Sequence, residues 1–303
     1  MEKAYFAGIF DGDGSFSLCK RIDRSSVLYI PLIQLSTTYK KLPEKLKEVF
    51  GGSVSIRAKY IGKDGSPRKE SYGWKLYNSH CDTLLKSIVN FLIVKQDQAK
   101  LLMHYISTNK FVRRVAISSE KQKERAHIYA KMKNLNKKNG VSKVVFPRKR
   151  KTVEDGIFWS YLAGLMDTDG SFTIKKQKNG YYAPVISLTM KNNQAIRYIL
   201  QNCEYGAACI INAITARSGY CYRFGVYKVE ECIFFLEHLI PYMDIKKPMA
   251  EVLLLYCKEK KCNKDIDNAL WYERIVRLNG VYKSFLIDLE AYSESHGDKA
   301  EDI

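Results

Sequence analysis

The chain has 303 residues, enough for one large domain or two modest ones. Its 50 Lys and Arg outnumber 32 Asp and Glu, and the resulting net charge of +18 points to a polyanionic partner. Nucleic acid is the first candidate. A membrane surface is disfavoured, because the sequence contains no run of 18 apolar residues and its basic residues are spread over predicted strands as well as helices.

Eight cysteines lie at scattered positions without a short disulfide framework, so we predict reduced thiols and a reducing compartment. Cys257 and Cys262 have a loose ligand-like spacing, but no second pair follows and a zinc site is not favoured. No secretory or transit sequence is recognisable before the first apolar helix. We expect the protein to act where it is made: a mitochondrion or chloroplast if it is encoded there, otherwise the cytoplasm.

The first predicted element is an apolar helix that ends in FAGIFDGDG at residues 6–14, and the pattern returns as LAGLMDTDG at residues 162–170. Each copy runs into Asp-x-Asp-Gly, where the glycine is predicted to supply a left-handed stop before a strand. A glycine inside a helix, as at Gly8 and Gly164, costs about 1 kcal/mol relative to alanine, which close helix packing would offset.

Acids at a helix C-terminus are unfavourable by about 0.3–1 kcal/mol each, because the last carbonyls already carry partial negative charge. Packing of the two helices side by side in the same direction would gather four acids at one end: Asp11, Asp13, Asp167 and Asp169. Such a cluster is tolerable mainly around a divalent metal. An EF-hand calcium loop is excluded, because twelve-residue loops begun at the motifs would end on Ile22 and Lys178 instead of Glu.

Hydrophobic periodicity and turn residues predict the elements between the two motifs. They are strands 15–21 and 27–38, helix 42–50, strands 53–60 and 72–78 around a basic loop 62–69, helices 80–93 and 96–108, and a basic helix 118–138. Residues 139–154 form the predicted connector, either a solvated linker or a segment that contacts phosphates.

The same order follows the second motif. It comprises strands 171–178 and 181–191, helix 194–203, strands 207–215 and 220–227, and helices 230–242 and 248–260. Only the tail, residues 271–286, has no partner in the repeat. We therefore predict an α+β fold of two pseudo-symmetric αββαββα repeats, each with an antiparallel sheet that packs one face on helices and keeps the other polar. The predicted domains are residues 1–138, a linker 139–154, and residues 155–303.

Strand alternation assigns each side chain to one face of its sheet. The predicted inward residues of the first half are Phe16, Leu18, Trp74 and Leu76. The predicted outward residues are Ser15, Ser17, Cys19, Arg21, Gln34, Arg57, Lys59 and Lys75 in the first half, and Ser171, Thr173, Lys175, Gln177, Ser187 and Arg223 in the second. A strand ribbon of such residues can read base edges in the major groove, although any one of them alone could be merely solvated.

The double motif resembles the LAGLIDADG homing endonucleases in their single-chain, two-motif form, and the resemblance extends over nearly the whole chain. It implies saddle-like sheets joined by a linker and packed through the two motif helices. It also implies a monomer that binds a long asymmetric double-stranded DNA target and hydrolyses one phosphodiester per strand with divalent metal, leaving short 3′ overhangs.

The resemblance also implies roles for the motif residues. Asp13 and Asp169 match the metal-binding acid, with backbone carbonyls of Gly12 and Thr168 completing the shell. Magnesium is the expected ion; Mn²⁺ or Ca²⁺ can occupy the same site, Ca²⁺ without supporting cleavage. Four further motif residues are predicted to hold the turns and the helix pair together: Asp11, Asp167, Gly8 and Gly164.

The segments around Lys95 and Lys246 resemble the family's catalytic-lysine element, so these lysines are predicted to stabilise phosphate charge or orient water. Ordinary surface lysines are the alternative. Thr37 and Met190 correspond to a position where some members carry a water-positioning Gln. Methionine cannot do this, which predicts an asymmetric or slower second site.

Two alternatives to a nuclease share the fold. One is an RNA maturase that binds its intron RNA and assists splicing, and the other is a non-cleaving DNA-binding regulator. The retained acids at positions 13 and 169 and lysines at positions 95 and 246 favour the nuclease.

Overall fold

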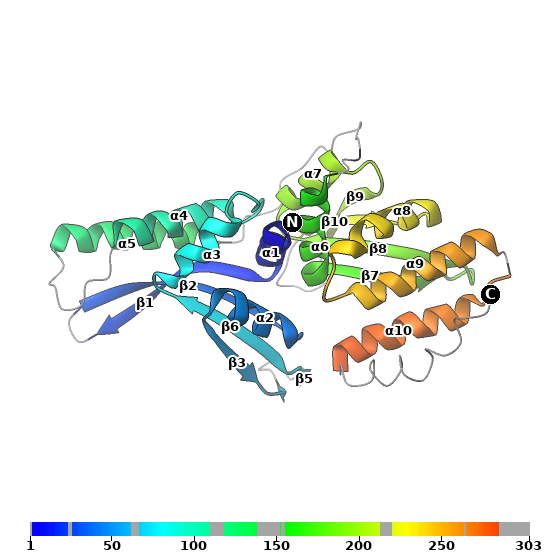
Figure 1. The fold of residues 1–303 in the computed structure, drawn as a ribbon, viewed down its shortest axis with the longest axis horizontal. Coiled ribbons are helices and arrows are strands. Elements are labelled where there is room, and N and C mark those ends of the chain that lie inside the picture. Colours follow the sequence, from blue (N-terminus) through cyan, green and yellow to red (C-terminus); the bar gives the residue numbers. More distant parts are fainter. Residues whose placement is uncertain are drawn as a thin grey trace.

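The fold consists of two halves that meet at a central pair of helices (Figure 1). The computed structural model describes residues 2–23, 26–61, 67–109, 118–137, 152, 155–212, 220–263 and 265–284. The predicted linker therefore lies almost entirely outside the described residues. None of the described helices has the length and apolar character needed to cross a membrane.

The N-terminal half is an antiparallel sheet of order β1-β2-β6-β3 packed against five helices. Its elements are α1 (Glu2–Gly12), β1 (Gly14–Asp23), β2 (Ser26–Thr37), α2 (Lys41–Phe50), β3 (Ser53–Arg57), β6 (Ser71–Tyr77), α3 (His80–Ile88), α4 (Gln96–Thr108) and α5 (Ser119–Leu135). Between β3 and β6, the short strands β4 (Tyr60–Ile61) and β5 (Pro67–Arg68) pair separately. The predicted strand 53–60 is thus divided into two.

The C-terminal half repeats this arrangement with sheet order β7-β8-β10-β9. Its elements are α6 (Gly156–Asp169), β7 (Gly170–Lys176), β8 (Tyr182–Met190), α7 (Asn193–Asn202), β9 (Ala207–Asn212), β10 (Tyr220–Val226), α8 (Val229–Leu239), a 3-10 turn (Ile240–Tyr242), α9 (Lys247–Cys262) and α10 (Asn268–Ser284). The predicted α+β fold with two antiparallel sheets is confirmed.

The inner face of each sheet forms a hydrophobic core with the helices. The four predicted inward residues of the first half are all buried: Phe16, Leu18, Trp74 and Leu76. None of the eight cysteines, which all lie in the described part of the chain, forms a disulfide, and four of them are buried in these cores: Cys81, Cys203, Cys232 and Cys257.

The C-terminal helix α10 is the counterpart of α5, which corrects the prediction that the tail has no partner. Asn136, at the end of α5, donates its Nδ2 to the carbonyl of Phe16 at 2.9 Å. Asn279 of α10 donates its Nδ2 to the carbonyl of Phe172 at 3.1 Å. The asparagines are 143 positions apart and the phenylalanines 156, so a fixed repeat period does not reveal the match.

Helix α3 ends at Ile88, five residues before its predicted end at residue 93. The amides of Ile93, Val94 and Lys95 donate instead to the carboxylate of Asp11. A helix through these residues would direct the same amides at its own carbonyls. A long-range carboxylate therefore ends the helical region here.

Candidate active site at the ends of the paired motif helices

Helices α1 and α6 pack in parallel with their backbones in direct contact. A Cβ added at Gly8 would lie 2.1 Å from the carbonyl oxygen of Tyr161, and one at Gly164 would lie 2.0 Å from that of Tyr5. Only glycine allows so close an approach. The parallel packing brings the C-terminal ends of both motifs together, between the two sheets (Figure 1).

The end of each motif helix is capped by a lysine from the same half. Lys95 Nζ donates to the carbonyls of Phe10, Gly12 and Gly14 at 2.9, 2.8 and 2.7 Å. In the second half, the amine of Lys246 makes the equivalent contacts. They are to Met166 at 3.2 Å, Thr168 at 2.7 Å and Gly170 at 2.6 Å. The ammonium ion thus donates to carbonyls at the helix C-terminus and at the start of the following strand, and it favourably opposes the helix dipole.

The prediction of a left-handed glycine stop is wrong. Gly170 has extended backbone angles, φ −76° and ψ 161°, and Gly14 is not among the glycines with positive φ. Glycine is needed here for space. A Cβ at Gly14 would lie 2.7 Å from the carbonyl oxygen of Phe10, and one at Gly170 would lie 2.5 Å from that of Met166.

The first acid of each motif is buried and accepts hydrogen bonds from a loop of its own half. Asp11 Oδ2 accepts from the amides of Ile93 at 2.7 Å and Val94 at 2.9 Å, and its Oδ1 accepts from the Lys95 amide at 2.8 Å. Burial raises the pKa of Asp11, whereas these amides and the Tyr161 hydroxyl lower it. The carboxylate thereby fixes the loop that presents the capping lysine.

Asp167 repeats this arrangement in the C-terminal half. Its Oδ2 accepts from the amides of Asp244 at 2.9 Å and Ile245 at 3.1 Å, and its Oδ1 accepts from the Lys246 amide at 2.7 Å. Burial raises its pKa, again opposed by these hydrogen bonds. Both halves therefore use the same acid, loop and lysine to shape the end of the motif helix.

The second acid of each motif, Asp13 and Asp169, is exposed where the two helix ends meet. A Cβ at Gly12 would lie 3.4 Å from Asp169 Oδ2, so the second carboxylate borders the first motif. Desolvation and the charge of Asp169 raise the pKa of Asp13 to about 6, opposed by Lys246 and Lys95. Desolvation also raises the pKa of Asp169. Two carboxylates are thus held together against their repulsion.

This set of donors fits a divalent cation. Carboxylates and backbone carbonyls are the oxygen ligands that magnesium and calcium prefer. The carbonyls of Gly12 and Thr168 each accept one lysine hydrogen bond, and a carbonyl oxygen has a second lone pair. No group of three or more His, Cys, Asp or Glu side chains able to hold a metal occurs in the described ranges, so metal binding here would depend on the exposed motif acids and backbone oxygens.

None of the fourteen residues predicted to contact DNA is buried. The register places Ser15, Gln34 and Lys75 in one row across the first sheet, and Ser171 opposite Ser187 in the second. Lys59 and Gln177 lie just outside strands. The other twelve lie in strands, on the faces turned away from the helices.

The outer face of the first sheet is only partly polar, which corrects the predicted polar face. Leu28, Ile30 and Leu32 are half-buried and lie opposite Arg21, Cys19 and Ser17, and directly paired residues share a face. Tyr77, opposite Leu32, is also exposed on this face. The second strand, β2, carries apolar residues on both of its faces, so its outer face is polar only at some positions.

Thr37 and Met190 occupy equivalent positions in the two sheets, as the strand registers show. Gly14 pairs with Leu35 and Gly170 with Leu188, so each of the two residues lies two positions beyond an equivalent pair. Thr37 Oγ1 accepts from the amide of Tyr39 at 3.2 Å, and Met190 is buried. The two halves therefore differ in chemistry at this position.

Tyr5 and Tyr161 were not among the predicted site residues, yet their hydroxyls donate to Asp167 Oδ2 at 2.8 Å and to Asp11 Oδ2 at 2.9 Å across the helix pair. A sequence signal exists, because each tyrosine stands at the same position of its copy, in YFAG and YLAG. Their partners, however, belong to the opposite half.

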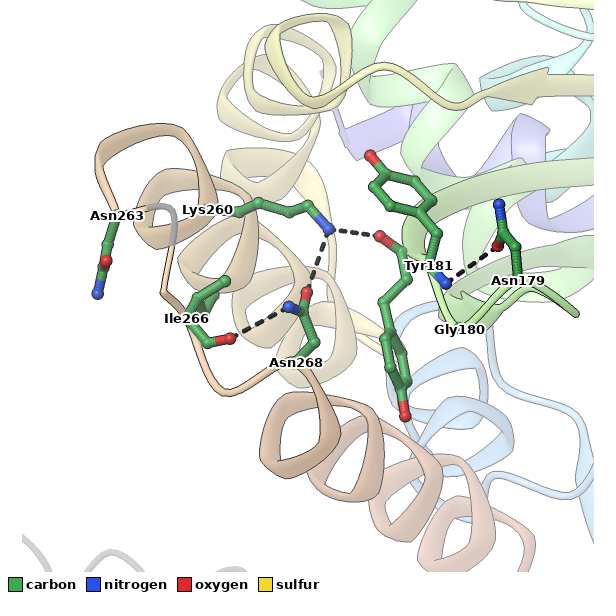
Figure 2. Close-up of a pocket in the computed structure, with 8 residues that line it drawn as sticks. Asn179, Gly180, Tyr181, Lys260, Asn263, Ile266 and Asn268 are labelled. Carbon is green, nitrogen blue, oxygen red and sulfur yellow. Dashed lines mark hydrogen bonds between the residues drawn. The ribbon is translucent and has the colours of Figure 1, made fainter.

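A separate pocket lies where the β7–β8 turn meets α9 and α10 (Figure 2). Lys260 Nζ there donates to the Tyr256 hydroxyl at 2.8 Å, to Asn268 Oδ1 at 3.1 Å and to the carbonyl of Tyr182. It also lies 4.5 Å from the centroid of the Tyr181 ring. The amine is therefore used to join two helices and a strand, and no motif acid lines the pocket.

The fold defined by these two halves is that of the LAGLIDADG homing endonucleases. I-GzeII in complex with its DNA target superposes with a TM-score of 0.65 at 15% identity, covering 91% of this chain and 96% of that one. I-LtrWI bound to target DNA gives 0.60 at 18% identity, with 92% and 97% covered. I-SmaMI bound to uncleaved DNA with calcium gives 0.56 at 18% identity, with 93% and 98% covered. No protein-family model and no curated protein matches the sequence.

Proposed function

We propose that this protein is a site-specific double-stranded DNA endonuclease of the LAGLIDADG homing type. The observation that carries the proposal is the meeting of Asp13 and Asp169 at the ends of two parallel helices, between two sheets that expose polar side chains. Solved structures of the same fold include I-GzeII with its DNA target and I-SmaMI bound to cleaved DNA. Phosphodiester hydrolysis is therefore the reaction that this arrangement supports best.

The two sheets support recognition of an asymmetric target. Ser15, Gln34 and Lys75 form one row of the first sheet, and the equivalent row of the second is Ser171, Ser187 and Gly225. Gln and Lys can hydrogen-bond base edges in the major groove, whereas glycine has no side chain with which to do so. Equivalent positions of the two halves therefore read different base pairs, and a palindromic site would not suit both.

Divalent metal, with magnesium expected, would be held by one motif acid per active site, Asp13 in one and Asp169 in the other, together with the carbonyls of Gly12 and Thr168. When bound, it would supply Lewis-acid stabilisation of phosphoryl charge and a more acidic water. The protein contributes the placement of these oxygens. Each lysine fixes its motif carbonyls, and Asp11 and Asp167 fix the lysine loops.

The lysine geometry favours positioning over direct contact with DNA. All three N–H groups of Lys95 and of Lys246 are directed at carbonyls of their own half. Their positive charge still lies near both exposed acids, where it lowers the pKa of Asp13 and Asp169. We therefore assign them to holding the motif ends and keeping the acids ionised.

The function is tested with Asp13→Asn, Asp169→Asn and the double variant on a DNA target selected from the gene that flanks the reading frame. Wild-type protein should cut both strands in magnesium and leave short 3′ overhangs. Each single variant should retain nicking of one strand. The double variant should bind with near-wild-type affinity and cut neither strand, because the carboxylates serve chemistry and not duplex affinity. Cleavage by the double variant at the wild-type rate would place the active site elsewhere.

Sedimentation should give a monomer, because one chain already contains both motif helices; an obligate dimer would contradict the proposal. A maturase of the same fold would instead bind its structured intron RNA and promote splicing. Tight RNA binding together with an inert DNA target would support that alternative.

A further inference from the structure

Each motif helix carries a tyrosine whose hydroxyl crosses to the other half. Tyr5 is buried in α1 and donates to Asp167 Oδ2 at 2.8 Å, while Tyr161 is buried in α6 and donates to Asp11 Oδ2 at 2.9 Å. These side-chain hydrogen bonds join residues 162 and 150 positions apart in the sequence. They link the two halves directly at their catalytic ends.

Asp167 is the centre of the C-terminal site. Its oxygens accept the amides of residues 244–246 at 2.7–3.1 Å. Lys246, at the end of that loop, in turn donates to the carbonyls on either side of Asp169, those of Thr168 and Gly170. The hydroxyl of Tyr5 therefore contacts the carboxylate on which the placement of Asp169 depends.

The N-terminal site mirrors this chain of contacts. Tyr161 donates to Asp11, which accepts the amides of residues 93–95. Lys95 then donates to the carbonyls of Gly12 and Gly14, on either side of Asp13. Each half thus supplies the tyrosine of the opposite site.

We propose that Tyr5 and Tyr161 are positioning residues that act across the helix pair, each holding the active site of the opposite half. The proposal rests on the nuclease function proposed above. Neither tyrosine touches the exposed acids or the substrate. Each acts through a carboxylate, a backbone loop and a lysine.

The physical basis is the buried position of the two carboxylates. Asp11 Oδ2 and Asp167 Oδ2 each accept two amides and one hydroxyl, and both residues are buried. A buried ionised oxygen that loses a charge-assisted hydrogen bond has no water to replace it, so the carboxylate and its loop lose a fixed arrangement. The lysine that caps the motif end moves with the loop.

The experiment compares Tyr5→Phe and Tyr161→Phe, each of which removes one hydroxyl and keeps the ring. Tyr105→Phe is the matched control, because Tyr105 is equally buried and its hydroxyl donates to the carbonyl of Tyr29 at 2.8 Å, within one half. Nicking rates are measured on a target labelled separately on each strand. The strand cut at each site is assigned from the single variants Asp13→Asn and Asp169→Asn.

We expect Tyr5→Phe to slow cutting at the Asp169 site about tenfold or more while the other strand changes less than about twofold. Tyr161→Phe should show the opposite bias, and Tyr105→Phe should show none. A purely structural role would slow both strands alike. Equal slowing, or slowing confined to the strand of the tyrosine's own half, would overturn the proposal.

Amide hydrogen exchange provides a readout independent of cleavage. In Tyr5→Phe the amides of residues 244–246 should exchange faster while those of 93–95 keep their protection, and Tyr161→Phe should reverse this. Unchanged exchange in both loops would overturn the proposal. If wild-type protein does not cut DNA, the nuclease function fails, and the exchange pattern alone decides whether each tyrosine holds the opposite loop.

Discussion

Thr168 occupies the space beside Gly12 at the point where the two motif helices end. These residues hold the same position in the two copies of the motif, yet a Cβ at Gly12 would lie 2.0 Å from Thr168 Oγ1. The Thr168 hydroxyl donates to the carbonyl of Leu165 at 2.9 Å, which fixes its rotamer. A side chain at position 12 would therefore collide with Thr168 in this rotamer.

This contact predicts a strong coupling between the two positions. Gly12→Thr should lower the free energy of unfolding by about 1–3 kcal/mol, because it overpacks the helix ends. The exchanged variant Gly12→Thr/Thr168→Gly should recover most of that loss, since one side chain again fills the space. Urea unfolding of the two single variants and the double variant gives the coupling energy. Additive effects would show that the two residues do not compete for this space.

The glycines inside the helix pair should be still less tolerant. Gly164→Ala should destabilise the protein by about 3 kcal/mol or more, because its Cβ would meet the backbone oxygen of Tyr5, which cannot move without separating the helices. Thermal unfolding measures the loss. Glu251→Ala, at an exposed position of α9, is the control and should stay within about 0.5 kcal/mol of wild type. A Gly164→Ala protein as stable as the control would contradict the close backbone contact.

Removing a capping lysine should affect both stability and cleavage. Lys95→Met keeps the length of the side chain but deprives the carbonyls of Phe10, Gly12 and Gly14 of their donor, for an expected loss of about 1–3 kcal/mol. Nicking at the Asp13 site should fall more than nicking at the Asp169 site. Lys100→Met, exposed on α4, should change neither unfolding nor strand bias. Equal loss on both strands would argue against separate caps for the two sites.

The raised pKa of Asp13 predicts how the acid affects stability with pH. In the folded protein the pKa of the Asp13 carboxyl is about 6, above its ordinary value of 3.8. Between pH 3.8 and about 6, the folded state therefore binds more protons than the unfolded state. Stability contributed by this group is therefore present at low pH and lost as pH rises toward 6. Asp13→Asn, without metal, should raise the melting temperature at pH 7.5, and this gain should vanish below pH 4. A variant less stable than wild type at pH 7.5 would contradict the repulsion between the two acids.

Added magnesium should reduce the stability advantage of Asp13→Asn over wild type at pH 7.5. The cation stabilises the folded state that binds it, so magnesium should raise the melting temperature of wild type more than that of Asp13→Asn. Equal shifts in both proteins would exclude a metal site that depends on this acid.

Binding to a DNA target should depend strongly on salt. With a net charge of +18, the protein should neutralise several phosphates and release their counterions, so affinity should fall steeply between about 50 and 200 mM salt. Fluorescence anisotropy of a labelled duplex measures the slope. Lys75→Ala should reduce that slope by about one unit or relax specificity at one base pair, depending on whether this side chain contacts phosphate or a base. A flat salt response would contradict an extended DNA interface.

The sequence by itself determined the duplicated architecture and the identity of the motif acids. Three local patterns occur in both halves of the sequence: the apolar helix with an internal glycine, the Asp-x-Asp-Gly ending and the alternating strands. Their repetition in the same order indicates two copies of one unit. Most helix and strand positions followed from the same local periodicity, because burial of one face dictates it wherever the element packs.

The tertiary structure decided how those patterns become a site. Four features depend on partners more than 75 positions away in the sequence. They are the capping of the motif helices by Lys95 and Lys246, the early end of α3, the match between α5 and α10, and the hydrogen bonds of Tyr5 and Tyr161 across the helix pair. Such contacts have no periodicity that a local pattern could reveal. They form because buried carboxylates and helix-end carbonyls must find donors, and in the folded chain the nearest donors come from distant segments.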